Sequence, residues 1–145
     1  MPTREEILHS ILEERTVDIV TTGRRTGRKR TTEIWTTPLF GRMYICGSPN
    51  ANIPDVDRKP RDWLANMLAY PDFTIRLKQS VKVDLPARAT PVHDTDERRK
   101  ILSAPSTAYY REARTFELAL CYSPIVRVIF LDKADWLNDA LAAAR

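Results

Sequence analysis

The residues of this chain that are best suited to chemistry are the cations of one short run, from Arg24 to Arg30. Five of its seven residues are Lys or Arg, Gly27 lies inside it and Gly23 directly precedes it. Glycine allows positive φ and lets backbone N–H groups converge into an anion-binding nest. Arginine adds forked donors that suit phosphate and carboxylate oxygens. We therefore predict that this basic run holds the anionic tail of a redox cofactor.

Other roles for a basic run are a solvated face, or a surface that rests on nucleic acid or on an acidic membrane. The chain has 23 Lys and Arg against 19 Asp and Glu, a formal net charge of +4. The excess lies in the run itself, which favours a specific anion site over a surface that coats a polyanion. The run also lacks the interleaved aromatic residues of a stacking platform, so nucleic acid is the least favoured partner.

The rest of the sequence offers few other groups for catalysis. It shows no evident pair of catalytic carboxylates and no Ser-His-Asp set, and its two cysteines and two histidines stand far apart. No metal site is predicted, because the chain has no Cys-x-x-Cys pair and its two histidines stand alone, which leaves too few grouped ligands for a structural zinc ion. We expect Cys46 and Cys121 to be reduced, partly buried thiols of a cytoplasmic protein. Hydride transfer fits this inventory, since a bound cofactor carries the reaction and the protein supplies placement and electrostatics.

Strands flank the basic run on both sides. Alternating apolar residues predict a strand at 17–20 and a second at about 31–40, broken at Pro38, so that the run is the loop of a β-hairpin. A third strand is expected at 43–47, and a helix with a Thr3–Glu6 capping box precedes the first strand. Acidic residues in that helix argue against a signal peptide. The sequence contains no run of 18 consecutive apolar residues, so no membrane-spanning helix is predicted.

The second half of the chain is predicted to mix helices with three further strands. The expected elements are a loop at 48–60, a helix from Arg61 to Pro71, strands at 73–78, 81–85 and 125–131, and helices at 95–102, 104–120 and from 134. A two-residue turn is expected between the strands on either side of 79–80. Six mostly antiparallel strands leave no exposed edges if they close into a barrel, so a closed barrel is the expected arrangement. We therefore predict one domain over 1–145, mainly β with α (α+β), with helices that flank the barrel.

Three stretches together resemble the deazaflavin-dependent nitroreductase family. They are residues 22–32, then 47–49 with 61–73, and finally 77–87, in an order and spacing similar to the family's. That family has the split β-barrel fold of pyridoxamine-phosphate-oxidase-like flavin proteins. The resemblance therefore implies a split six-stranded antiparallel β-barrel with flanking helices.

The resemblance also implies a cofactor and an activity. Members of the family bind coenzyme F-420, a deazaflavin with a phosphate-linked polyglutamate tail. The chain would then be an oxidoreductase, nitroreductase-like or quinone reductase-like, that passes hydride from the reduced deazaflavin to a quinone, a nitro compound or a similar small acceptor. The implied cofactor-binding residues are Arg24, Arg25, Thr26, Gly27, Arg28, Arg30, Thr31, Thr32, Gly47, Ser48, Pro49, Arg61, Asp62 and Trp63. We place Tyr109 and Tyr110 on the substrate side, as apolar rings that each carry a hydroxyl donor.

Two other functions on the same barrel stay open at this point. Relatives of the family load the barrel with flavin mononucleotide (FMN), and a non-catalytic carrier or binding protein could use the same fold. The absorbance spectrum of the purified protein would separate the FMN alternative from a deazaflavin enzyme. Barrels of this kind pair across apolar outer strands, so we expect a homodimer. Its face would come from Tyr44 and Cys46, or from Val126, Val128 and Phe130.

Overall fold

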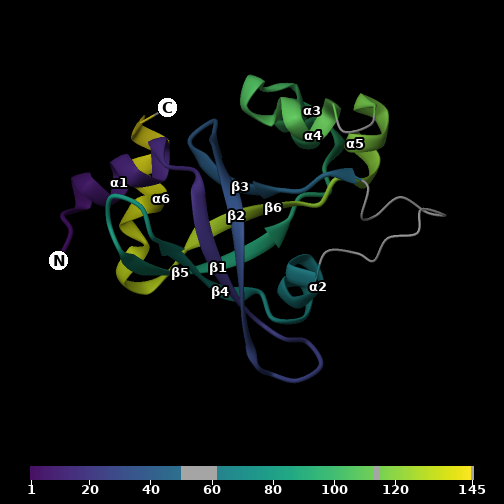
Figure 1. Ribbon diagram of the computed structural model, residues 1–145. Helices are drawn as coiled ribbons and strands as arrows, with labels where there is room; N and C mark the ends of the chain where they lie inside the picture. The colour runs from purple at the N-terminus through teal and green to yellow at the C-terminus, as the bar shows by residue number, and fades with distance from the viewer. Residues whose placement is uncertain (50–61, 113–114, 145) are drawn as a thin grey trace.

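The barrel is the centre of the structure, a computed structural model that describes residues 1–49, 62–112 and 115–144. Within these residues six strands close into an antiparallel barrel with the neighbour order β1-β2-β3-β6-β5-β4 (Figure 1). The strands are β1 (Thr16–Thr22), β2 (Lys29–Leu39), β3 (Arg42–Cys46), β4 (Asp72–Leu77), β5 (Val83–Pro91) and β6 (Ile125–Phe130). The predicted fold class, an α+β split barrel with flanking helices, is confirmed.

Strands β1 and β2 form the hairpin that carries the basic run. Their register pairs Thr16 with Trp35 at one end and Thr22 with Lys29 at the other, so the run is the connecting loop. Burial along β1 alternates strictly, because successive side chains of a strand point to opposite faces. In Figure 1 this loop projects from the lower end of the barrel, below α2 (Asp62–Ala69).

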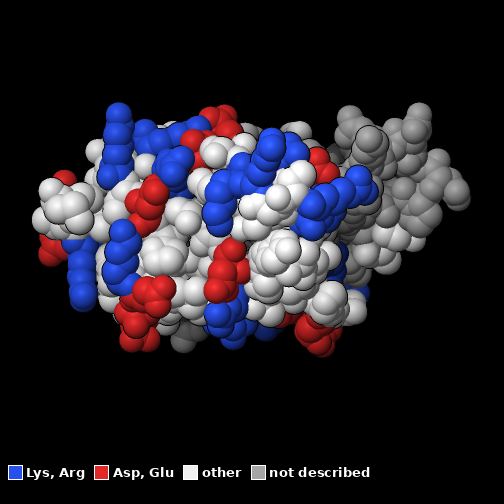
Figure 2. Space-filling model, turned by 90° about the horizontal axis from the view of Figure 1, so that it is seen from below, with Lys and Arg blue, Asp and Glu red and all other residues white. Residues whose placement is uncertain are grey.

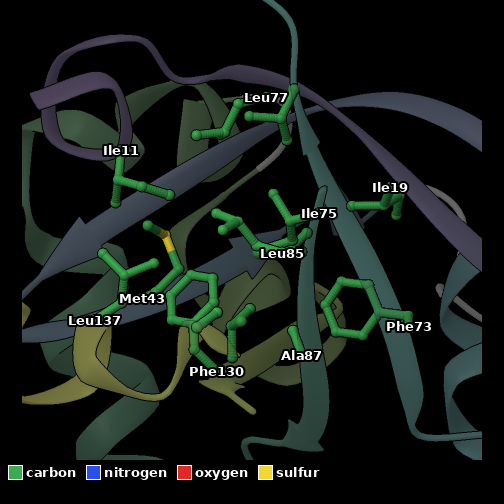
Figure 3. Packing of buried hydrophobic residues seen from close by; sticks show 14 of the residues in the cluster. Ile11, Ile19, Met43, Phe73, Ile75, Leu77, Leu85, Ala87, Phe130 and Leu137 are labelled. Atoms are coloured by element: carbon green, nitrogen blue, oxygen red, sulfur yellow. The ribbon is translucent and has the colours of Figure 1, made fainter. Parts of the chain in front are cut away.

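The barrel interior is filled by aliphatic and aromatic side chains from the inward positions of its strands. Figure 3 shows Ile75 and Leu85 near the middle of this cluster, with Met43, Phe130 and Leu137 packed to one side. These five residues are at most 2% exposed, so the interior is a packed core.

Helices α1 (Arg4–Glu13) and α6 (Trp136–Ala144) lie side by side at one end of the barrel (Figure 1). The predicted capping box of α1 is present: the Thr3 amide donates to Glu6 Oε1 at 2.9 Å, and the Glu6 amide donates to Thr3 Oγ1 at 3.1 Å. A short 3-10 helix, η3 (Asp132–Ala134), precedes α6. Ile11 and Leu137 from these two helices join the barrel core. The two helices therefore cover this end of the barrel core.

A second, smaller core lies under α3 (Thr95–Ser103), α4 (Ala108–Glu112) and α5 (Phe116–Tyr122). The prediction of a single helix at 104–120 is wrong, because the structure has a 3-10 turn, η2 (Pro105–Thr107), followed by α4 and α5. Thr115 begins α5 as an N-cap, its hydroxyl accepting the Leu118 amide at 3.2 Å. Arg98 crosses the group and donates to the carbonyls of Leu120 and Ser123 at 2.8 and 2.7 Å. Burial lowers the pKa of this guanidinium.

The outer faces expected to form a dimer are covered within the chain itself. Tyr44 and Cys46 belong to the second core, and Val126, Val128 and Phe130 have at most 2% exposure. Strand β3 therefore packs against the helices of its own chain, which is why its apolar residues occupy both faces. The prediction that these residues form the dimer face is therefore wrong. The homodimer itself stays a prediction.

Two strand details also differ from expectation. Pro38 does not break β2, which continues to Leu39 and pairs Pro38 with Met43. Strand β1 pairs with β2 only as far as Trp35, so Pro38 lies where β2 has one neighbour and a missing amide donor costs little. The turn after β4 covers residues 78–82 and is longer than the two residues expected. In the part of the chain described, no helix has the length and apolar character needed to cross a bilayer.

Candidate functional site

The basic loop is held in shape by its glycines and by Thr26. The Gly23 amide donates to the Arg28 carbonyl and the Gly27 amide to the Gly23 carbonyl, both at 2.8 Å. Gly27 has a φ of +72°, a left-handed conformation that side chains rarely adopt. A Cβ on Gly23 would lie 3.0 Å from Thr26 Oγ1 and 3.1 Å from the Arg28 carbonyl oxygen. The loop is thus a compact turn.

Helix α2 fixes this loop through Asn66, which is 3% exposed. Asn66 Oδ1 accepts both the backbone amide and Nη1 of Arg24, each at 3.1 Å. Its Nδ2 donates to the buried Thr21 Oγ1 at 3.4 Å. Arg24 Nη2 also meets Asp62 Oδ1 at 3.5 Å. One side chain on a helix therefore anchors a hairpin loop that lies 42 positions away in the sequence.

A cavity of about 620 Å³, here called the basic cavity, lies between the loop and α2. Its lining residues are Gly23, Arg24, Arg25, Thr26, Arg30, Asp62, Ala65 and Asn66. Three guanidinium groups face one carboxylate, so the cavity has a positive field. Among the described residues, the guanidinium groups of Arg25 and Arg30 have no acidic partner. Figure 2 looks onto this end of the molecule, where several Lys and Arg side chains gather.

A second cavity of about 260 Å³, here called the aromatic cavity, lies between β2, the end of β3, α2 and α4. Its lining residues are Thr32, Glu33, Ile34, Trp35, Cys46, Gly47, Ser48, Trp63, Tyr109 and Tyr110. Trp35 meets Tyr109 edge-on with ring centroids 5.6 Å apart, and Tyr109 meets Tyr110 at the same distance. Trp35 and Tyr109 are 46% and 63% exposed, whereas Trp63 is buried. The cavity thus has a solvent-facing aromatic mouth and an apolar floor.

Glu33 is the one charged residue among those that line the aromatic cavity. Its carboxylate accepts a hydrogen bond from Lys78 Nζ, which also donates to Asp18 Oδ1 at 2.8 Å. These two carboxylates raise the pKa of the Lys78 ammonium, Asp18 having the larger effect. Lys78 is therefore shared by two carboxylates on the outer face of the barrel and offsets the charge of Glu33 only in part.

Gly47 shapes the floor of the aromatic cavity by its lack of a side chain. Its amide donates to the Pro124 carbonyl at 2.8 Å. A Cβ at this position would lie 2.6 Å from Pro124 Cγ and 3.5 Å from the Trp63 ring. Only glycine lets β3 run this close to the segment that enters β6, and the close approach leaves room beside Trp63.

Two elements, β2 and α2, supply lining residues to both cavities. Along β2, Arg30 lines the basic cavity and Thr32 the aromatic one, and two residues of a strand span about 7 Å. At the start of α2, Asp62 lines the basic cavity and the next residue, Trp63, lines the aromatic one. A flat ring with an anionic tail can therefore contact both cavities at once.

Cys46 is the thiol that lines the aromatic cavity, and it stays protonated. Burial raises its pKa to about 12. A thiol in that state is a poor nucleophile, so nucleophilic catalysis by Cys46 is excluded near neutral pH. Cys121 was also expected to be partly buried, but it is exposed on α5.

The two thiols should accordingly differ in reactivity. At about pH 8, iodoacetamide is expected to modify Cys121 of the folded protein and to leave Cys46 intact, because only the thiolate reacts. Intact-mass spectrometry should find one adduct on the wild type and none on the Cys121→Ser variant. Alkylation after unfolding in urea should add the second. Two adducts on the folded wild type would show that Cys46 ionises in place, contrary to its burial.

The structure distributes the sequence-predicted residues over the two cavities. Arg24, Arg25, Thr26, Arg30 and Asp62 line the basic cavity, and Thr32, Gly47, Ser48, Trp63, Tyr109 and Tyr110 line the aromatic one. Gly27, Arg28, Thr31 and Pro49 line neither, and Arg61 lies outside the described residues. The side chain of Asp62 meets Arg24 in the basic cavity.

Sequence reasoning missed Asn66 and Trp35 as site residues. Asn66 stands between Trp63 and Met67 on the buried stripe of α2, and a polar residue on an apolar stripe is a signal of a specific partner. Trp35 is on the outward face of a strand, where a large exposed aromatic residue is a similar signal.

A closed barrel of six antiparallel strands, with a basic hairpin loop beside an aromatic cavity, places this chain among the split-barrel cofactor-binding proteins. The model of the F420H(2)-dependent quinone reductase family matches residues 9–119, and the chain belongs to this family. The family membership makes the protein a reductase that depends on a deazaflavin coenzyme.

Solved structures share this fold at low sequence identity. An F420-H2 dependent reductase (FDR-A) is 20% identical with a TM-score of 0.53, over 79% of this chain and 94% of its own. A candidate 5-nitroimidazole antibiotic resistance protein from Bacteroides thetaiotaomicron is 12% identical with a TM-score of 0.63, over 91% and 82%. The heme storage protein HutZ from Vibrio cholerae is 13% identical with a TM-score of 0.54, over 91% and 92%. No curated protein sequence matches the chain significantly.

Proposed function

We propose that this chain binds reduced coenzyme F-420 across the two cavities and transfers its hydride to a quinone, a nitro compound or a similar small acceptor. The observation that carries the proposal is the contrast between the cavities. One presents three arginines to a phosphate or carboxylate tail, and the other presents aromatic and apolar walls to a flat ring. The basic cavity, at about 620 Å³, lies within the roughly 300–1,000 Å³ of small-molecule sites, and the aromatic cavity, at about 260 Å³, lies just below that range.

The residues of the basic cavity fit the tail of the coenzyme. Arg25 and Arg30 are free of acidic partners among the described residues, and Arg24 is fixed by Asn66. A charge-assisted hydrogen bond from a guanidinium to an anionic oxygen contributes about 1.5–3 kcal/mol, less where water screens it. Two or three such bonds give micromolar binding only when burial of the ring adds to them. Both cavities are therefore needed.

The coenzyme supplies the hydride, and the chain's own residues bind it and orient the acceptor. Trp63 offers an aromatic wall to the ring, and the protonated Cys46 thiol keeps that wall apolar. Tyr109 and Tyr110 are the proposed acceptor contacts, because both line the aromatic cavity. Tyr109 is 63% exposed at its mouth, whereas Tyr110 is buried deeper. No other catalytic side chain is required, because the coenzyme carries the reaction.

Three titrations of the purified protein, followed by fluorescence, test the proposal. The ligands are oxidised coenzyme F-420, the same deazaflavin without its phosphate-linked tail, and FMN. We expect F-420 to bind in the micromolar range, the tail-less ring at least tenfold more weakly, and FMN more weakly than F-420. Reduced coenzyme should then be oxidised in the presence of a soluble naphthoquinone or a nitroaromatic compound. Tighter binding of FMN than of F-420 would overturn the deazaflavin assignment and favour the flavin alternative.

A further inference from the structure

Asp62 is a carboxylate in a cavity that is otherwise built for anions. It is the one acidic residue among those that line the basic cavity, and its side chain is 79% exposed. Its Oδ1 lies 3.5 Å from Arg24 Nη2, at the outer limit of a hydrogen bond. An ion pair this long and this exposed contributes little to stability. A carboxylate in the first turn of α2 favours the helix, but that position alone does not require a contact with Arg24.

Arg24 differs from the other two arginines of the cavity. Its amide and its Nη1 are held by Asn66, so its guanidinium is already oriented before any ligand arrives. Arg25 and Arg30 have no such anchor among the described residues. A pre-oriented donor binds an anion with less loss of side-chain entropy than a free one. Arg24 is thus the arginine of the cavity that is best oriented to bind an anion, and it is also the one that already pairs with a carboxylate.

We propose that Asp62 competes with the anionic tail of the coenzyme for Arg24, and thereby weakens binding and speeds release. The inference rests on the proposed function. A phosphate or carboxylate tail displaces Asp62 from Nη2, because the existing contact is long and solvated. The displaced carboxylate stays on the first turn of α2 and repels the bound tail. In water, two like charges at such separations change an affinity by about three- to fivefold at low salt.

Faster release has a chemical use at this site. A hydride donor that is consumed in one turnover must be exchanged for a reduced molecule, or be reduced again in place, before the next turnover. A tail held by every cation of the cavity without opposition would favour slow exchange. A carboxylate that competes for Arg24 keeps the tail exchangeable without removing the arginines that attract it.

The test is the Asp62→Asn variant, which keeps the size of the side chain and removes its charge. We expect it to bind coenzyme F-420 about three- to fivefold more tightly than the wild type in about 50 mM salt, with a slower dissociation rate. The gain should shrink in about 0.5 M salt, where exposed charges are screened. Affinity for the deazaflavin without its tail should stay the same, because that ligand has no group for the basic cavity.

Asp84→Asn is the matched control. It changes the net charge of the protein by the same amount, and Asp84 is likewise an exposed partner of an arginine, Arg76, at 2.9 Å, but it does not line the cavity.

Equal gains for both variants would reveal a general charge effect and overturn the inference. An Asp62→Asn affinity equal to or weaker than that of the wild type would also overturn it, while a wild type that binds F-420 keeps the proposed function. A wild type that fails to bind F-420 overturns the proposed function itself. Asp62→Ser, a second neutral variant, must shift the affinity in the same direction.

Discussion

Replacing Arg25 and Arg30 together by alanine is expected to weaken the binding of coenzyme F-420 by about thirtyfold. Both side chains line the basic cavity, and neither has an acidic partner among the described residues. Each loses one charge-assisted contact to the tail, and exposure to water reduces each loss to roughly fivefold. Fluorescence titration of the double variant measures the effect. The tail-less deazaflavin should bind the variant and the wild type equally, because it reaches only the aromatic cavity.

Arg28→Ala is the control for that double variant. Arg28 belongs to the same loop and carries the same charge, but it does not line the basic cavity. Its backbone amide and carbonyl bond to Thr26 and Gly23, and these bonds survive the substitution. We expect a loss of affinity within about threefold, from the weaker long-range field alone. If Arg28→Ala weakened binding as much as the double variant, the whole charge of the loop and not this cavity would hold the tail.

The barrel could be predicted from the sequence because its signals are local. Alternation along β1 and β4 follows directly from the two faces of a strand, and the Thr3–Glu6 capping box is complete within four residues. The extent of β2 could not be predicted, since Pro38 reads as a strand breaker. Only the end of its pairing with β1 at Trp35 shows that a proline is tolerated there.

The candidate site was predictable as a set of residue types, but its division into two cavities was not. Arg24 and Asn66 are 42 positions apart, and nothing in their neighbours indicates that they meet. Tyr109 and Trp35 come together because α4 packs over the end of β3, and that packing depends on the second core. The same packing buries Tyr44 and Cys46, which read as an outer face in the sequence alone. Such features depend on tertiary contacts that local patterns do not encode.

Replacing Asn66 by leucine is expected to reduce both the stability of the protein and its affinity for the tail. The change removes the acceptor of the Arg24 amide and Nη1, and the donor to Thr21 Oγ1, without creating a large void. Partly buried polar groups left without partners cost about 2–3 kcal/mol in total, which lowers the melting temperature of a chain of this size by roughly 5–10 °C. Thermal unfolding followed by circular dichroism measures this shift.

The effect of Asn66→Leu on binding separates a positioning residue from a purely structural one. If Asn66 only stabilised α2, the folded variant would bind F-420 and the tail-less deazaflavin as the wild type does. If Asn66 positions the loop, F-420 should bind about tenfold more weakly and the tail-less ring should be unaffected. Asn66→Asp keeps an acceptor for Arg24 and should hold the loop, but its added carboxylate should still repel the tail. A leucine variant that binds F-420 normally would therefore mean that the loop keeps its binding conformation through Gly23, Thr26 and Gly27 alone.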